Sequence, residues 1–183
     1  MDAVVTLLSL PQNAVIQEVW ADLREQCGLK GIEVTPIPHF SWHAAGSYDL
    51  DKADELLARF AKELVSFNVR AGGLGLFMNQ EPVLYLSVAK NRSLLDLHEQ
   101  LWPTLNHLGA DLNPYYSPDG WMPHITLAQW GLTVDRIACA LTVLKEFDLS
   151  IDIQVDNLAI IRQTSRKVGA LRAAFPFGTQ GKM

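Results

Sequence analysis

Residues 121–130 read WMPHITLAQW, and the rest of the chain is organised around this stretch. Its apolar residues alternate around His124 and Thr126, a pattern that predicts a half-buried β-strand. Successive side chains on a strand point to opposite faces, so His124 and Thr126 share one face while Ile125 and Leu127 occupy the other. The sequence therefore predicts an imidazole and a hydroxyl side by side on one exposed strand surface.

A second stretch repeats this order of residue types. Residues 37–42 read IPHFSW, with Pro38 before His39 and with Ser41 two positions after it. Both stretches thus run apolar, Pro, His, apolar, hydroxyl, apolar, and each falls in its own half of the chain. We interpret the two stretches as halves of one active site.

Composition places the chain among globular proteins of one domain. Of its 183 residues, 49% are hydrophobic and 19% are charged. A chain of this length buries about 70% of its unfolded surface, enough for a sizeable core. No low-complexity linker interrupts the sequence, so we expect residues 1–183 to form one bilobal domain, with lobes near 1–90 and 91–178. Cys27 and Cys139 are isolated and lack CxxC spacing, so neither a disulfide framework nor a zinc knuckle is expected.

Charge and apolar runs limit the partners and the location that we expect. The net charge of −5 argues against extended binding to DNA or RNA, which needs a basic footprint. It still allows a small nucleotide or an RNA terminus held by a few local donors. Residues 1–10 lack the features of a signal peptide, and no apolar run could span a bilayer. We therefore expect a cytoplasmic monomer with no membrane partner.

Hydrophobic periodicity predicts seven strands and four helices. Strands are expected at 3–10, 33–43, 67–78, 83–89, 121–130, 149–162 and 168–177, and helices at 13–28, 49–64, 93–109 and 133–144. Each half supplies one His-x-Ser/Thr strand and a following helix. This order predicts an α+β fold with a pseudo-two-fold arrangement of two antiparallel sheets, flanking helices and a central cleft.

Local signals refine the expected element boundaries. Asn13 is expected to cap the first helix, Ser93 with Asp96 to form a capping box for the third, and Thr133 to cap the fourth. The glycines of residues 71–75 precede a strand rather than a helix, so they predict a bulged or closely approached strand and not a phosphate loop. His98 and His107 fall in the third helix and are expected at its surface.

These features resemble the two-histidine (2H) phosphoesterase superfamily. That superfamily includes the bacterial 2'-5' RNA ligase-like proteins and the 2',3'-cyclic nucleotide phosphodiesterases. The resemblance is strongest at residues 121–128, WMPHITLA, and extends to GGLGLF at 72–77 followed by VLYLSV at 83–88, which is similar to the family's central hairpin. It covers nearly the whole chain in element order, but only these short pieces in residue identity.

The resemblance implies catalytic roles for His39 and His124 and phosphate binding by Ser41 and Thr126. The chain departs from the family pattern at Gln129, where many relatives carry a basic residue. It departs again at residues 42–43, where a Trp and a second His replace a plain aliphatic run. These departures concern substrate preference more than the class of reaction.

The implied chemistry is hydrolysis of a cyclic phosphodiester by acid and base. One group must take a proton from water, and another must protonate the departing sugar oxygen. An imidazole with a pKa near ~6.5 can do either at neutral pH. The two hydroxyls, one strand step from each imidazole, can donate to the charge that builds on the phosphoryl oxygens. The scheme requires no metal and no cofactor.

Aromatic side chains and a second histidine carry further expectations. Tyr115, Tyr116 and Trp121 could stack on a base at the rim of the site, or could equally be the packed lining of a loop; Gln129 is also expected at the rim. His39 and His43, four residues apart, could suggest a metal-binding helix face. Pro38 and the alternation indicate a strand instead, and no third ligand is placed nearby.

Other interpretations stay open at this point. Taken singly, His39 or His124 could be a histidine with ordinary structural hydrogen bonds, whereas the matched pair favours catalysis. The same acid–base pair could serve 2'-5' ligation or 2'-5' phosphodiester cleavage, because the two directions share one pathway. A non-catalytic module that binds nucleotides or RNA ends is a further alternative, although a pure binder would favour permanent cations such as Arg. The sequence does not decide the natural substrate, the base preference or which histidine is the acid.

Overall fold

Two antiparallel sheets form the centre of the molecule in the computed structural model, which describes residues 1–163 and 168–178. The five-stranded sheet has the order β5 (Gly109–Leu112), β2 (His39–Tyr48), β1 (Asp2–Leu7), β8 (Asn157–Arg162) and β9 (Ala170–Pro176). The four-stranded sheet has the order β6 (His124–Gln129), β4 (Val83–Val88), β3 (Phe67–Phe77) and β7 (Ile151–Val155). The predicted α+β fold with two antiparallel sheets is confirmed.

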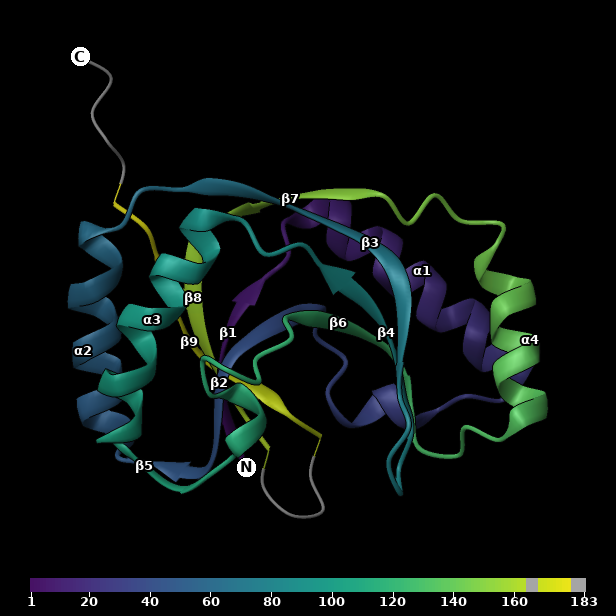
Figure 1. The fold of residues 1–183 in the computed structure, drawn as a ribbon, viewed down its shortest axis with the longest axis horizontal. Helices are drawn as coiled ribbons and strands as arrows, with labels where there is room; N and C mark the ends of the chain where they lie inside the picture. The colour runs from purple at the N-terminus through teal and green to yellow at the C-terminus, as the bar shows by residue number, and fades with distance from the viewer. Residues whose placement is uncertain (164–167, 179–183) are drawn as a thin grey trace.

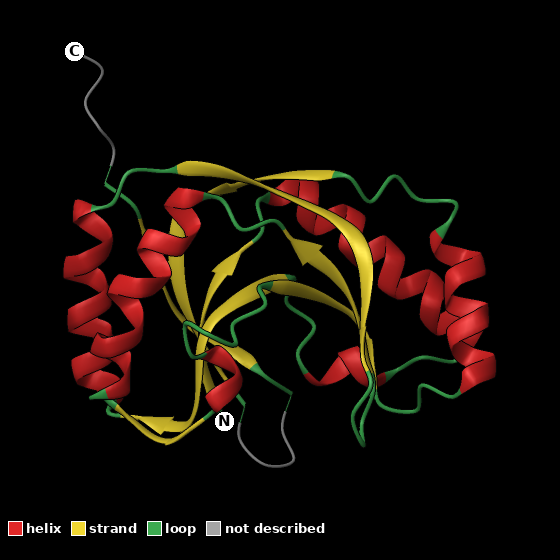
Figure 2. Cartoon of the chain, viewed as in Figure 1, coloured by secondary structure: helices red, strands yellow, loops and turns green. Residues whose placement is uncertain are grey.

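The helices lie at the two ends of the molecule, with the sheets between them (Figure 1). α2 (Leu50–Glu63) and α3 (Arg92–Asn106) pack on the five-stranded sheet, whereas α1 (Leu10–Cys27) and α4 (Val134–Leu144) pack together beside the four-stranded sheet. Figure 2 shows this division by element type, with both helix pairs outside the strands. Among the described helices, none is long and apolar enough to cross a membrane.

The two lobes do not correspond to the two halves of the sequence. Strands from residues 1–90 and from residues 91–178 occur in both sheets, and β1 pairs directly with β8. The expected lobe boundaries near residue 90 are therefore wrong. Each sheet is completed by strands that come from far away in the chain, which periodicity along the sequence does not reveal.

Helix starts follow the physical rules, although two predicted caps are wrong. α1 begins at Leu10 after Ser9, because Pro11 fits the first helical turn, where its missing N–H costs nothing; Asn13 lies inside the helix. The α3 cap is Asn91, whose side chain accepts a hydrogen bond from the Leu94 N–H at 2.9 Å, rather than a box of Ser93 and Asp96. Thr133 caps α4, as predicted.

Three strand predictions change in the structure. The strand expected at 33–43 begins only at His39 and continues to Tyr48, after a 3₁₀ turn at Gly31–Val34. The strand expected at 149–162 is two strands, β7 and β8, which belong to different sheets. β5 was not predicted, because its four residues carry too little pattern. The predicted bulge in β3 is confirmed between Ala71 and Leu74.

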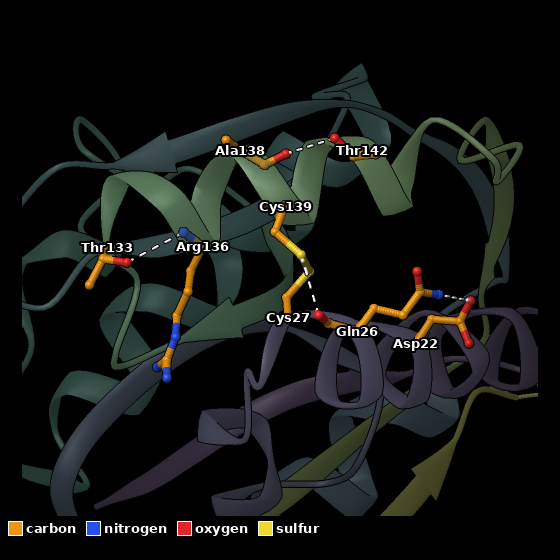
Figure 3. The surroundings of a disulfide bond; sticks show 8 residues. All are labelled: Asp22, Gln26, Cys27, Thr133, Arg136, Ala138, Cys139 and Thr142. Atoms are coloured by element: carbon orange, nitrogen blue, oxygen red, sulfur yellow. Dashed lines mark hydrogen bonds between the residues drawn. A yellow bond between two sulfur atoms is a disulfide. The ribbon is translucent and has the colours of Figure 1, made fainter.

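A disulfide corrects the expectation for the two cysteines. Cys27 at the end of α1 is bonded to Cys139 on α4, with 5.8 Å between their Cα atoms (Figure 3). The two residues are 112 positions apart, so their spacing gave no sign of the pairing. Disulfides are rare in cytosolic proteins, and this bond therefore weighs against the cytoplasm as the default location.

We predict that this disulfide contributes to stability by restricting the unfolded chain. Disulfides typically raise the free energy of unfolding by about 2–4 kcal/mol, and the loop-entropy limit for a loop of this size is about 4.7 kcal/mol. Urea unfolding with and without dithiothreitol measures the difference. The Cys27→Ser, Cys139→Ser double variant is the control. Its free energy of unfolding should equal that of the reduced wild type and should not change when dithiothreitol is added. Equal stability of the oxidised and reduced wild type would contradict the prediction.

Candidate active site

The four residues of the two motifs line one cavity. His39 and Ser41 come from β2 in one sheet, and His124 and Thr126 come from β6 at the edge of the other. The cavity has a volume of about 260 Å³. The structure thus brings together the two pairs that the sequence analysis set side by side.

The alternation that pointed to each strand is present in the burial of its side chains. In β2, Phe40 and Trp42 have no exposed surface, while the flanking His39 and Ser41 are half-buried. In β6, the residues between and after the two motif side chains are likewise buried, whereas the imidazole and the hydroxyl are half-buried. The apolar faces anchor both strands in the core and leave the polar faces to the cavity.

Each motif strand carries a β-bulge at the same position. The register with the neighbouring strand skips Trp42, directly after Ser41, and skips Leu127, directly after Thr126. A bulge adds one residue to one strand, bends it and re-aims the side chains beside it. The two motifs are therefore alike in backbone geometry as well as in sequence.

Both imidazoles are held in the same way by the backbone. The Nδ1 atom of His39 lies 2.5 Å from the carbonyl oxygen of Ile37, and Nδ1 of His124 lies 2.6 Å from that of Met122. A carbonyl only accepts, so Nδ1 carries a hydrogen in each ring. Nε2 is then the nitrogen that each ring can offer to a ligand, as a base when neutral and as an acid when protonated.

Burial makes both imidazoles weaker bases than a free histidine. Desolvation lowers the pKa of His39, the hydrogen bond to Ile37 opposes this shift, and the nearby charge of His124 lowers the pKa further. Desolvation also lowers the pKa of His124, against the hydrogen bond to Met122. Both rings therefore favour the neutral form near pH 7. The two rings face each other's electrostatic influence because they line one cavity.

Two tryptophans fix the backbone beside the two hydroxyls. The indole N–H of Trp121 donates to the carbonyl oxygen of Ser41 at 2.9 Å, and that of Trp20, on α1, donates to the carbonyl oxygen of Thr126 at 3.0 Å. The first of these bonds crosses from the segment before β6 to β2, so it joins the two sheets. Sequence reasoning did not find this role for either tryptophan.

Trp121 is not available to stack on a base. Only 1% of its surface is exposed, and its ring packs between those of Trp42 and His98, with centroids 5.3 and 3.8 Å away. Of the two alternatives for Trp121, stacking at the rim is therefore wrong and the packed lining of a loop is correct, because the ring faces are already covered. The surface position expected for His98 is also wrong: its Nε2 lies 3.0 Å from the carbonyl oxygen of Tyr116, and its side chain is buried.

His43 lies on the core side of β2 and does not join a metal site. Its Nδ1 lies 2.5 Å from the Tyr48 hydroxyl and its Nε2 lies 2.8 Å from Oδ1 of Asn106. The bulge at Trp42 places it among buried side chains. Within residues 1–163 and 168–178, no group of three His, Cys, Asp or Glu side chains is arranged to hold a metal.

His124 rests against a small aromatic cluster on the four-stranded sheet. Its ring centroid lies 5.0 Å from that of Phe77 and 5.1 Å from that of Tyr85, and these two rings stack at 4.2 Å. Gly75 makes this packing possible, because a Cβ there would lie 2.2 Å from the Tyr85 ring. The central hairpin thus supports the second histidine directly.

A larger pocket adjoins the cavity of the two motifs. It has a volume of about 410 Å³ and shares His124 and Tyr116 with the cavity. Tyr115 on its edge is 76% exposed, whereas Tyr116 is half-buried. Burial raises the pKa of Tyr116, against a hydrogen bond with the Ser41 side chain. Gln129 lines the cavity of the two motifs itself.

A family model supports what the geometry suggests. The sequence model of the 2'-5' RNA ligase superfamily matches residues 11–167. The chain belongs to the 2'-5' RNA ligase superfamily. This membership confirms the resemblance to the two-histidine phosphoesterases. A search of curated protein sequences gives no match.

Solved structures share the fold of this superfamily member over its whole length. TT0787 of Thermus thermophilus is 19% identical, with a TM-score of 0.69, and the match covers 98% of this chain and 99% of that one. Escherichia coli LigT in its apo form is 16% identical, with a TM-score of 0.63 and 97% of each chain covered. LigT complexed with 3'-AMP is 14% identical, with a TM-score of 0.58 and coverage of 97% and 99%.

The two cavity histidines should titrate below the usual range and should influence each other. We expect NMR titration to give pKa values below ~6.5 for both. In His124→Ala the pKa of His39 should rise, because a neighbouring charge and part of the desolvation are removed. The His107→Ala variant removes an exposed imidazole and should leave the pKa of His39 unchanged. A His39 pKa above ~6.5 in the wild type would oppose this account.

Buried His98 should make stability depend on pH. Burial lowers its pKa to about 4, so between that value and ~6.5 the unfolded chain binds a proton that the folded chain does not. Stability should therefore fall as the pH drops through this window, by up to about 3 kcal/mol from this group. Urea unfolding at several pH values measures the slope. His98→Phe should flatten it, and an unchanged slope would argue against a buried neutral ring.

Proposed function

We propose that this protein is a metal-independent phosphodiesterase that hydrolyses 2',3'-cyclic phosphates of RNA ends or small nucleotides. The observation that carries the proposal is the single cavity lined by His39, His124, Ser41 and Thr126. In it, both imidazoles keep Nδ1 on a backbone carbonyl and so have Nε2 for the reaction. Two such groups and two hydroxyl donors are what a cyclic phosphodiester needs.

The reaction follows from the two protonation states. One neutral imidazole takes a proton from water as the water oxygen forms a bond to phosphorus. The bond between phosphorus and one sugar oxygen breaks, and the other, protonated imidazole gives its proton to that oxygen. One water is consumed, a phosphate monoester and a sugar hydroxyl form, and the proton states of the two rings are exchanged. A proton transfer between the rings, through solvent, restores the starting state.

Neutral donors stabilise the negative charge that builds on the phosphoryl oxygens. The hydroxyls of Ser41 and Thr126 follow the two imidazoles on the cavity face, and the tryptophan hydrogen bonds to their carbonyls limit movement of both strands. Donors held in place before the reaction cost no reorganisation when charge develops. An anionic substrate also raises the pKa of a nearby imidazole, which supplies the protonated ring that burial disfavours in the free protein.

The donor set supports chemistry without a metal. Nδ1 of each cavity histidine is already hydrogen-bonded to the backbone, and within the described residues no third His, Cys, Asp or Glu joins the two rings as a ligand group. A metal site on His39 and His43 would need the His43 ring, but both of its nitrogens are hydrogen-bonded in the core, to Tyr48 and Asn106. Two imidazoles alone make a poor cage for the metals that catalyse phosphoryl transfer.

The adjoining pocket is the site that we assign to the nucleoside. It meets the catalytic cavity at His124 and Tyr116, and its other lining is mainly apolar and aromatic, including exposed Tyr115 and Met122. Tyrosine rings stack on bases of any sequence. The LigT relative has been solved in complex with 3'-AMP and with ATP, which supports a nucleotide as the ligand class.

Substitution of either histidine is the decisive test. Turnover of a panel of 2',3'-cyclic nucleotides should fall by about 10²–10⁴ in His39→Ala and in His124→Ala, because each removes one proton transfer. Ser41→Ala and Thr126→Ala should cost on the order of 2–4 kcal/mol in the barrier. Wild-type rates should be equal with and without EDTA. Product analysis identifies which sugar oxygen leaves.

The controls separate catalysis from folding and from other activities. His107→Ala removes an exposed histidine and should keep full activity. Urea unfolding should give similar stability for all variants, since the substituted groups face a cavity. Activity that vanishes in EDTA and returns with zinc or manganese would overturn the mechanism. Hydrolysis of 2'-5' linkages, their ligation, or nucleotide binding without turnover would each replace the proposed reaction.

A further inference from the structure

We propose that Trp130 forms a second aromatic subsite, on the side of the reacting phosphate opposite to the adjoining pocket. Trp130 would then favour, among the phosphodiesters of the superfamily's kind, those with a nucleoside on both sides. This inference goes beyond the proposed function, because a 2',3'-cyclic phosphate carries a nucleoside on only one side of phosphorus. Trp130 lines the catalytic cavity together with the four motif residues, and 40% of its surface is exposed.

The order of residues along β6 places the two subsites apart. Met122, before the strand, lines the adjoining pocket, and His124 lines both spaces. Thr126 and, after the strand, Trp130 line the catalytic cavity but not the adjoining pocket. Six residues of strand span up to about 20 Å. A nucleoside in the adjoining pocket would therefore lie toward Met122, and a second one beyond the phosphate would meet Trp130.

The backbone at Trp130 is in a conformation that a bulky side chain rarely adopts. Its φ is +56°, and that of Gly131 is +68°. For a non-glycine residue with a large side chain, this left-handed region costs on the order of 1–3 kcal/mol, and such residues cluster at ligand sites. The conformation turns the chain sharply after β6 and leaves the indole on the cavity.

Two hydrogen bonds hold this turn and its ring in place. The indole N–H donates to Oε2 of Glu81 at 2.8 Å, which ties the ring to the tip of the hairpin between β3 and β4. Nη1 of Arg136 donates to the carbonyl oxygen of Gly131 at 3.1 Å. A ring fixed by its edge keeps its faces for stacking. That is the geometry of a platform for a base rather than of a core side chain.

A second subsite suits substrates that a mononucleotide cannot represent. An internucleotide phosphodiester places one nucleoside on each side of phosphorus, as does a cyclic end approached by the 5'-hydroxyl of another chain. A mononucleoside 2',3'-cyclic phosphate fills only one side. Stacking of the second base should strengthen binding on the order of 10- to 100-fold. Trp130 is thus a binding and specificity residue, while the imidazoles remain the acid and base.

Binding can be measured without turnover in the His39→Ala, His124→Ala double variant. Isothermal titration should compare 2'-5'-linked ApA with adenosine 2',3'-cyclic phosphate, before and after Trp130→Ala. We expect the dinucleotide Kd to rise on the order of 10- to 100-fold and the cyclic mononucleotide Kd to change less than about twofold. Trp130→Phe should preserve most of the dinucleotide affinity. Glu81→Ala should lose part of it, because the ring is released.

Tyr115→Ala serves as the matched aromatic control, since it removes a ring from the adjoining pocket and should weaken both ligands. Equal weakening of both ligands by Trp130→Ala, or no change in either, would overturn the second subsite. The proposed function is tested separately by wild-type turnover. If Trp130→Ala weakens only dinucleotide binding and the wild type hydrolyses no cyclic phosphate, the proposed reaction is refuted and the second subsite is supported. If the wild type hydrolyses cyclic phosphate but Trp130→Ala does not selectively weaken dinucleotide binding, the reaction is supported and the second subsite is refuted.

Discussion

The hydrogen bond from the indole of Trp121 to the carbonyl oxygen of Ser41 joins the two halves of the site. It runs from the segment that leads into His124 to the strand that carries His39, at 2.9 Å. The ring that makes it is stacked on both faces and almost fully buried, so it has little freedom to move. The separation of the two imidazoles thus depends on the packing of one aromatic stack in the core.

β2 and β6 lie in different sheets, yet each positions its histidine and its hydroxyl residue in the same way. Each has a proline before its histidine, a backbone carbonyl for Nδ1, a bulge after its hydroxyl and an indole bond to the hydroxyl residue's carbonyl. An acid and a base need different protonation states, yet the backbone contacts around the two imidazoles are nearly alike. The difference must then come from the bound substrate and from neighbours such as the Phe77–Tyr85 cluster, which packs against His124.

Period-2 alternation was enough to predict the two motif strands, because it fixes which side chains share a face. It could not place Trp121 or His98, since an aromatic stack formed by α3, β2 and the loop before β6 has no local pattern. The Cys27–Cys139 bond was missed for the same reason: its two helices meet only in the folded chain. The place of Trp130 on the cavity was not predicted, because a positive φ at a bulky residue contradicts every local preference.

The exchange of strands between the two sheets affects how the chain can fold. β1 lies between β2 and β8, so one of its edges stays open until residues after 156 are available. During synthesis the first half therefore exposes unpaired strand edges, which are sites of wrong pairing and aggregation. Contacts so distant in sequence also favour slow folding. A fragment made by cutting the chain near residue 90 should not be an independent folding unit, because each sheet would then lack strands from the other half of the chain.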